Sequence, residues 1–147
     1  MLDLVASELF VVGALRAWVA PLVRPKGLYP EWRDIFRMAQ VAPPGAVGFE
    51  LLMSVVSSHA QRSIEVRCCH CPALAGDEAA MLRLVAGLQA GDSFSALDVL
   101  SDWLPVAMVA PGFRGAQRFA ALTAEAGLRL PAQPLHLAPL PVARVLH

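Results

Sequence analysis

Charged residues are scarce in this sequence. They make up 16% of its 147 residues, whereas a typical globular protein has about 25%. Lys+Arg and Asp+Glu number 12 each, so the formal net charge is zero, and the basic excess typical of nucleic-acid-binding proteins is missing. Hydrophobic residues account for 56%, which excludes a disordered chain. A surface with so little charge predicts that part of it is covered by a second copy, a partner or a membrane.

Lysine and cysteine are also rare. Lys26 is the only lysine and all other basic residues are arginines, a bias typical of a GC-rich bacterial genome. The three cysteines all lie within residues 68–71, which does not suit the disulfide framework of a small secreted protein. Asp3 and Glu8 occupy the stretch where a signal peptide would carry basic residues. We therefore expect a bacterial protein of the cytoplasm.

The common catalytic motifs are absent. The sequence has no G-x-x-x-x-G-K-[ST], no strand-linked G-x-G-x-x-G, no H-E-x-x-H and no G-x-S-x-G. These absences argue against the usual nucleotide-binding, metalloprotease and hydrolase sites. An enzyme whose pocket is assembled from scattered residues would still be compatible with the sequence, for example around His59, Glu50 or Glu8.

Apolar residues recur at helical spacing in segments that are separated by proline and glycine. This pattern predicts a mainly α, single-domain bundle of about six helices packed around the first one. The expected helices span about 3–20, 30–40, 45–61, 77–90, 93–103 and 112–126. A further short helix is expected to have Pro105 in its first turn and to end at Pro111.

The first of these helices has no polar face, so we expect it to lie inside the bundle. Glu8 and Arg16 fall on its bulky apolar side. They are about 12 Å apart along one helix and cannot pair with each other. Each is therefore predicted to be buried and to pair with a charge from another helix or another protomer. The opposite side carries small residues such as Gly13, which would let another backbone approach closely.

Residues 63–68 alternate between apolar and polar side chains, the pattern of a half-buried strand. A lone strand leaves its backbone groups unpaired. Its expected partner is the tail of residues 128–147, or the same segment of a second chain. This tail is rich in proline and leucine, and we expect it to be extended and packed on the helical domain of residues 1–127 or on a partner subunit.

The cysteine cluster contains residue types that bind zinc. Cys69, Cys71 and His70, with His59 as a further ligand, form the candidate metal set. On an extended chain only alternate side chains converge, namely Cys69 with Cys71, or Cys68 with His70. The two separated ligand pairs of a structural zinc motif are missing. A metal- or redox-responsive role is therefore the alternative, and reduced cysteines at a strand end, with Cys68 buried, are the favoured interpretation.

Two pairs of like charges lie four residues apart. Asp98 and Asp102 could bind a cation or act in acid–base catalysis, but such pairs more often form a solvated face. Arg114 and Arg118 could hold a phosphate or a partner's carboxylate. A simple ion pair with a nearby acidic residue is the favoured interpretation for the arginines.

Three functions are compatible with these patterns. The first, which we favour, is association as a homodimer with an interaction or regulatory role, because two-fold dimers are the commonest oligomers. The second is the metal or redox role of the cysteine cluster. The third is peripheral membrane binding through residues 9–23. That stretch is shorter than the roughly 20 apolar residues of a membrane span and lacks a basic face, so a membrane role is not expected.

Overall fold

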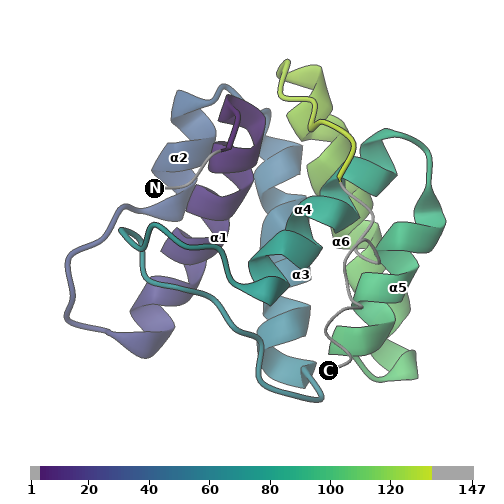
Figure 1. Cartoon of the computed structure of the whole chain (residues 1–147), viewed down its shortest axis with the longest axis horizontal. Helices are drawn as coiled ribbons and strands as arrows, with labels where there is room; N and C mark the ends of the chain where they lie inside the picture. The colour runs from purple at the N-terminus through teal and green to yellow at the C-terminus, as the bar shows by residue number, and fades with distance from the viewer. Residues whose placement is uncertain (1–3, 134–147) are drawn as a thin grey trace, which may run out of the picture.

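The computed structural model describes residues 4–133 and leaves residues 1–3 and 134–147 undescribed. The described part is a bundle of six helices (Figure 1). They are α1 (Ala6–Val23), α2 (Trp32–Met38), α3 (Pro43–His59), α4 (Gly76–Gln89), α5 (Ser93–Trp103) and α6 (Val106–Glu125). No strand occurs between residues 4 and 133. The predicted mainly α bundle of about six helices is confirmed.

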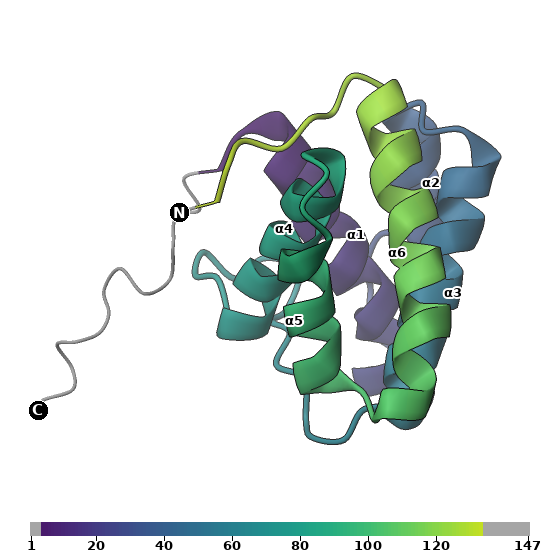
Figure 2. The same ribbon diagram turned by 90° about the vertical axis from the view of Figure 1, so that its right-hand side faces the viewer.

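The helix pair with the most extensive contact is α3 with α6. The two helices lie side by side in Figure 2, while α1 packs against α2 and α4. The sequence placed the first helix at the centre of the bundle. Its N-terminal two-thirds is indeed buried, but its last turns are half-buried or exposed. The bundle is therefore organised as much around the α3–α6 pair as around α1.

The α3–α6 pair is held at backbone contact by two glycines. A Cβ atom added to Gly48 would lie 2.8 Å from the carbonyl oxygen of Gly115, and one added to Gly115 would lie 2.7 Å from that of Gly48. No side chain fits at such distances. Glycine is required at both positions because it alone lets the two helix backbones touch.

Aromatic side chains from four helices form the centre of the core. Phe49 and Phe119 join α3 to α6 with ring centroids 4.8 Å apart. Phe36 of α2 lies 5.0 Å from Phe10 of α1 and 5.2 Å from Phe49. The short helix α2 is anchored to the bundle by these contacts, whose edge-on and tilted geometries suit the charge distribution of the rings.

Two prolines were predicted to end helices and do not. The first helix continues through Pro21 to Val23, and α6 begins directly after Pro105 and continues through Pro111. The separate short helix predicted before Pro111 is therefore wrong. A proline removes only one helical hydrogen bond. For Pro111 the carbonyl that loses its donor is that of Ala107, which is exposed and can bind water instead.

The predicted strand is an irregular stretch within residues 60–75, which connect α3 to α4. Two of its backbone N–H groups have hydrogen-bond partners other than the predicted neighbouring strand. The N–H of Glu65 donates to Oδ2 of Asp77 at 2.7 Å, and the N–H of Arg67 donates to Oε2 of Glu78 at 3.0 Å. Side-chain carboxylates of α4 take the place of a neighbouring strand for these two N–H groups, which therefore need no partner from the tail or from a second chain.

The chain after α6 begins to pack back onto the domain. Gln89 of α4 donates from Nε2 to the carbonyl of Leu128 at 3.1 Å and accepts the N–H of Leu130 at 2.7 Å. Both leucines are half-buried against the core. The predicted extended tail of residues 128–147 thus starts with a packed segment, and its larger part lies outside the described residues.

Candidate functional site

A buried ion pair joins α1 to α4. The guanidinium of Arg16 donates from Nε to Oε2 of Glu78 at 2.7 Å and from Nη2 to Oε1 at 2.8 Å. The side chains are 3% and 0% exposed. Arg16 is thus one of the two ionisable residues expected inside the first helix, and its partner comes from another helix of the same chain. Two parallel hydrogen bonds make this a strong and directional contact.

Glu8, the other expected buried charge, has different partners. Its side chain is buried. It accepts the N–H of Val5 at 3.1 Å through Oε1 and the side-chain amide of Gln133 at 3.0 Å through Oε2. The carboxylate therefore caps the start of α1, where the helix dipole favours a negative charge. Within residues 4–133 it pairs with no charged side chain, in contrast to the prediction from sequence.

The ion pair also holds the connection between α3 and α4. Arg16 donates from Nη1 to the carbonyl of Cys71 at 2.9 Å and from Nη2 to the carbonyl of Ala73 at 2.8 Å. Glu78 accepts the N–H of Arg67 on the other side of the cysteines. Figure 1 shows this connection passing beside α1. The position of the cysteine segment is therefore determined by two buried side chains.

Both members of the pair are held in their charged forms. The hydrogen bond to Glu78 raises the pKa of Arg16 against the opposing effect of burial. For Glu78, burial has the largest single effect on the pKa, and it raises the pKa because it disfavours the charged form. The hydrogen bonds from Arg16 and from the N–H groups of Ala75 and Arg67 together outweigh it and lower the pKa of Glu78. This is the pattern expected of a buried carboxylate with several donors.

A second polar network lies next to the first. Asp77 accepts hydrogen bonds from Nη2 and Nη1 of Arg62 at 2.7 and 3.0 Å and from the indole N–H of Trp103 at 3.2 Å. The bond from Arg62 is the main cause that lowers the pKa of Asp77, and the N–H of Glu65 and Trp103 add to it. Arg62 also pairs with Asp102. The start of α4 thus holds both ends of the long connection.

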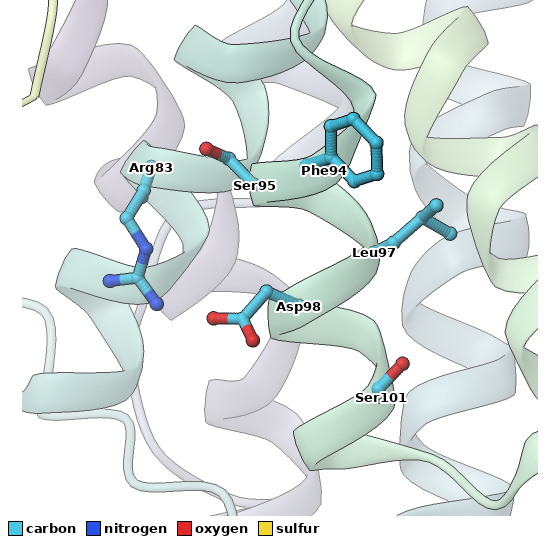
Figure 3. A pocket seen from close by; sticks show the side chains of 6 residues that line it. All are labelled: Arg83, Phe94, Ser95, Leu97, Asp98 and Ser101. Atoms are coloured by element: carbon cyan, nitrogen blue, oxygen red, sulfur yellow. The ribbon is translucent and has the colours of Figure 1, made fainter.

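The two residues of the acidic pair have different surroundings. Asp102 belongs to the Arg62 network, whereas Asp98 borders a broad, shallow depression between α4 and α5 (Figure 3). In that view Asp98 points towards the side of Arg83. Arg114 and Arg118 are exposed, and neither occurs in an ion pair within residues 4–133.

The cysteines form a turn rather than the end of a strand. The N–H of Cys71 donates to the carbonyl of Cys68 at 3.1 Å. Such a turn brings its first and fourth Cα atoms to within about 7 Å. We call residues 68–71 the cysteine turn. Cys68 is exposed, contrary to the prediction that it is buried, and Cys69 and Cys71 are half-buried; all three carry free thiols.

The candidate metal ligands are not gathered in one place. His59 lies exposed at the end of α3, and His70 is exposed in the cysteine turn, which also contains Cys69 and Cys71. Across the part of the chain that the structure describes, no three His, Cys, Asp or Glu side chains converge to hold a metal ion. Glu8, Glu50 and His59 line neither the depression between α4 and α5 nor the two cavities described below.

Two cavities lie on either side of the C-terminal end of α1. The first, which we call the thiol pocket, has a volume of about 350 Å³. Its lining includes Arg16, Leu28, Arg67, Cys68 and His70. Concave sites with a few polar groups on apolar walls are the usual places where small ligands bind. The thiol pocket therefore brings the cysteine turn and the buried arginine to one accessible space.

The second cavity, which we call the apolar groove, has a volume of about 260 Å³ and runs between α1, α3 and the connection to α4. Its lining is almost wholly apolar and includes Trp18, Leu22, Met53 and Ile64. Val19, Val23 and Val66 line both cavities. The thiol pocket and the apolar groove are therefore neighbours on one face of the molecule.

Sequence reasoning missed Glu78 as the partner of Arg16. An acidic residue in the first turn of a helix is commonly explained by its favourable interaction with the helix dipole alone. A signal was present, because Glu78 lies three, four and seven residues before Met81, Leu82 and Val85. Those three residues form the buried stripe of α4, so the helical period places the carboxylate in line with the core.

No protein family, curated protein or solved structure matches this chain. Its function is therefore argued from its own residues. Among residues 4–133, α1 is the one helix long and apolar enough to cross a membrane, and half of it is buried inside the bundle. Core helices of soluble proteins have the same character, so this helix is weak evidence for a membrane span.

Proposed function

We propose that this protein acts by association, as a homodimer with an interaction or regulatory role in the cytoplasm. The contact is made by the face at the C-terminal end of α1. The observation that supports this is a fully exposed leucine, Leu28, on the face that also contains the apolar groove. Leu22 and Val23 are exposed on the same face. Contiguous apolar surface of this kind usually marks an interaction site.

The face is suited to a second copy because it carries both a projection and a depression. In a two-fold dimer the same surface of each protomer meets its counterpart. Leu28 of one protomer would enter the apolar groove of its partner, and the reverse contact would form by symmetry. The net charge of zero means that two copies do not repel each other at long range.

The expected affinity follows from the area that is covered. Burying Leu22, Val23 and Leu28 is worth roughly 1.5–3 kcal/mol each. Association costs at least about 4 kcal/mol in lost translation and rotation. Both copies contribute in a two-fold dimer, but the cost of association reaches about 15 kcal/mol, so the two terms are of similar size and the dimer should respond measurably to dilution.

Sedimentation velocity tests the proposal. Wild-type protein is expected to be dimeric at about 100 µM and to dissociate on dilution. The variant Leu28→Glu is expected to be monomeric throughout, because it places a charge in the contact. Its fold should be unchanged, since Leu28 is 100% exposed.

Met38→Glu is the matched control. Met38 is 84% exposed at the end of α2 and lines neither the thiol pocket nor the apolar groove. The substitution adds the same charge, but dimerisation should persist. A monomeric wild type at about 100 µM, or equal effects of the two substitutions, would overturn the proposal. Flotation of a monomeric wild type with anionic vesicles would favour the peripheral membrane alternative instead.

A further inference from the structure

We propose that Cys68 and Cys71 form a reversible intramolecular disulfide by exchange with small anionic disulfides that enter the thiol pocket. The carrying observation is that one turn, fixed on the buried Arg16–Glu78 pair, has Cys68 at its first position, where it lines that cavity, and Cys71 at its fourth. The proposal does not depend on dimerisation, because both thiols belong to one chain.

The turn supplies the geometry that a disulfide needs. A disulfide requires Cα atoms roughly 4.4–6.8 Å apart, and the hydrogen bond from Cys71 to Cys68 closes a turn whose ends are within about 7 Å. Cys69 occupies a corner of the same turn. The pair at the two ends of the turn is therefore Cys68 with Cys71, the two-residue spacing of dithiol redox centres, and not the pairs expected for an extended chain.

The buried ion pair holds both sides of this turn. Arg16 donates to the carbonyl of Cys71, and Glu78 accepts the N–H of Arg67, which directly precedes Cys68. Ordering the backbone of a loop normally costs conformational entropy. Because folding has already ordered this loop, closing the disulfide should be easier in the native protein than in the unfolded chain.

The thiol pocket favours a particular class of disulfide. Its lining includes three arginines, Arg16, Arg24 and Arg67, and no acidic residue. Arg16 is already paired with Glu78 and Arg67 lies 4.0 Å from Glu65, so Arg24 is the one of the three without an ion pair within residues 4–133. Its guanidinium is suited to recognise a carboxylate. Cys68 and Cys69 line the pocket and Cys71 does not, and Cys68 is the exposed one of the three while the other two are half-buried. A small disulfide with carboxylate groups would therefore meet Cys68 first.

The exchange proceeds in two balanced steps. The sulfur of Cys68, as thiolate, attacks one sulfur of the small disulfide, whose S–S bond breaks and releases one thiolate. The sulfur of Cys71 then attacks the sulfur of Cys68, and the second small thiolate leaves. The two protein thiols are oxidised to one disulfide, the small disulfide is reduced to two thiols, and the two protons from the cysteines pass to the released thiolates.

The test is an equilibrium titration of the full chain with reduced and oxidised glutathione, followed by alkylation and mass spectrometry. The equilibrium constant for the intramolecular disulfide is expected to be at least about tenfold higher in the native protein than in concentrated urea. Peptide mapping should locate the bond between Cys68 and Cys71. This comparison needs no substitution, so it cannot fail through misfolding.

Three single variants complete the test. Cys69→Ser should keep the disulfide, whereas Cys68→Ser and Cys71→Ser should stop at a mixed disulfide with glutathione. Oxidised glutathione is anionic and cystamine is cationic. The ratio of the reaction rate with oxidised glutathione to the rate with cystamine should be higher for the native protein than for the protein in urea. The Met38→Glu variant, whose substitution lies outside the thiol pocket, should behave as the wild type does.

Several results would overturn the inference. Equal equilibrium constants in native and denaturing conditions would show that the fold does not position the pair. A bond through Cys69, or only bonds between chains, would show that the wrong thiols meet. Preference for cystamine would exclude the anionic class. Stoichiometric zinc in protein purified without chelator, bound through the cysteine turn, would assign the thiols to a metal instead.

Discussion

The Arg16–Glu78 pair explains how an irregular connection keeps one conformation in a helical bundle. Residues 60–75 contain no helix and no strand, so their backbone groups need partners from elsewhere. Glu78 accepts the N–H groups of Ala75 and Arg67, and Arg16 donates to the carbonyls of Cys71 and Ala73. Two side chains thus supply hydrogen bonds that a neighbouring strand would otherwise provide.

Breaking the buried pair is expected to be costly. Arg16→Ala or Glu78→Ala should each lower the free energy of unfolding by about 3–5 kcal/mol, because the remaining charge is buried without its partner. Urea denaturation near neutral pH measures the loss. The control is Arg37→Ala, whose partner Asp34 and own side chain are both more than half exposed, with an expected loss of at most about 1 kcal/mol. Similar losses in all three variants would contradict the prediction.

Acidification should destabilise the fold. The pKa values of Glu78 and Asp77 are lowered from their ordinary values of 4.5 and 3.8. The unfolded chain therefore takes up protons first, and the stability that these carboxylates provide is present above those values and lost as pH falls below them. We expect the free energy of unfolding to fall steadily from about pH 5 to about pH 3, as urea titrations at each pH would measure.

The variant Asp77→Asn tests whether this carboxylate contributes to the loss of stability at low pH. It should lower the stability near neutral pH and weaken the pH dependence, because one titrating carboxylate is removed. Asp34→Asn, at an exposed pair, should leave the dependence unchanged. A wild-type stability that is flat or rises on acidification would contradict the assignment.

At the scale of elements, the closest approach in the bundle is the crossing of α3 and α6. Gly48 and Gly115 bring the two backbones into direct contact. A methyl group at this point would have to push one helix away from the other, and the aromatic contact of Phe49 with Phe119 would open with it. The crossing therefore determines how tightly the core is packed.

Gly115→Ala should destabilise the protein by about 1–3 kcal/mol or more, as overpacking does. Gly13→Ala is the matched control, because Gly13 is also in a helix but an added Cβ meets no atom within 4 Å. It should stabilise the protein by about 0.5–1 kcal/mol through helix propensity. Thermal unfolding followed by circular dichroism measures both. A neutral Gly115→Ala would mean that α3 and α6 can separate without cost.

At the scale of the whole molecule, the low charge content is matched by an exposed apolar face around Leu28 and the apolar groove. If that face is the proposed dimer contact, stability depends on protein concentration, since association stabilises the folded state by mass action. The Tm of the wild type should therefore rise with concentration, and that of Leu28→Glu should not. A constant Tm for both would argue against a dimer that is coupled to folding.

The candidate site could be predicted from sequence only in part. The period of α1 placed Arg16 on the buried side, and the spacing of the cysteines marked them as chemically notable. The pairing of Arg16 with Glu78 spans 62 residues, and no local pattern encodes such a separation. Alternation in residues 63–68 suggested a strand because any extended segment that is buried on one side has a period of two. The same period arises whether the backbone hydrogen-bonds to a neighbouring strand or to side-chain carboxylates.

The sequence by itself determined the helical class and the approximate position of each helix, because the helical period of apolar residues is a local property. It also predicted the burial of α1, of which half is buried. Only the tertiary structure decided which charge meets Arg16, that the cysteines form a turn, and that two glycines touch. These features depend on distances between distant segments, and such distances are set by how the whole core packs.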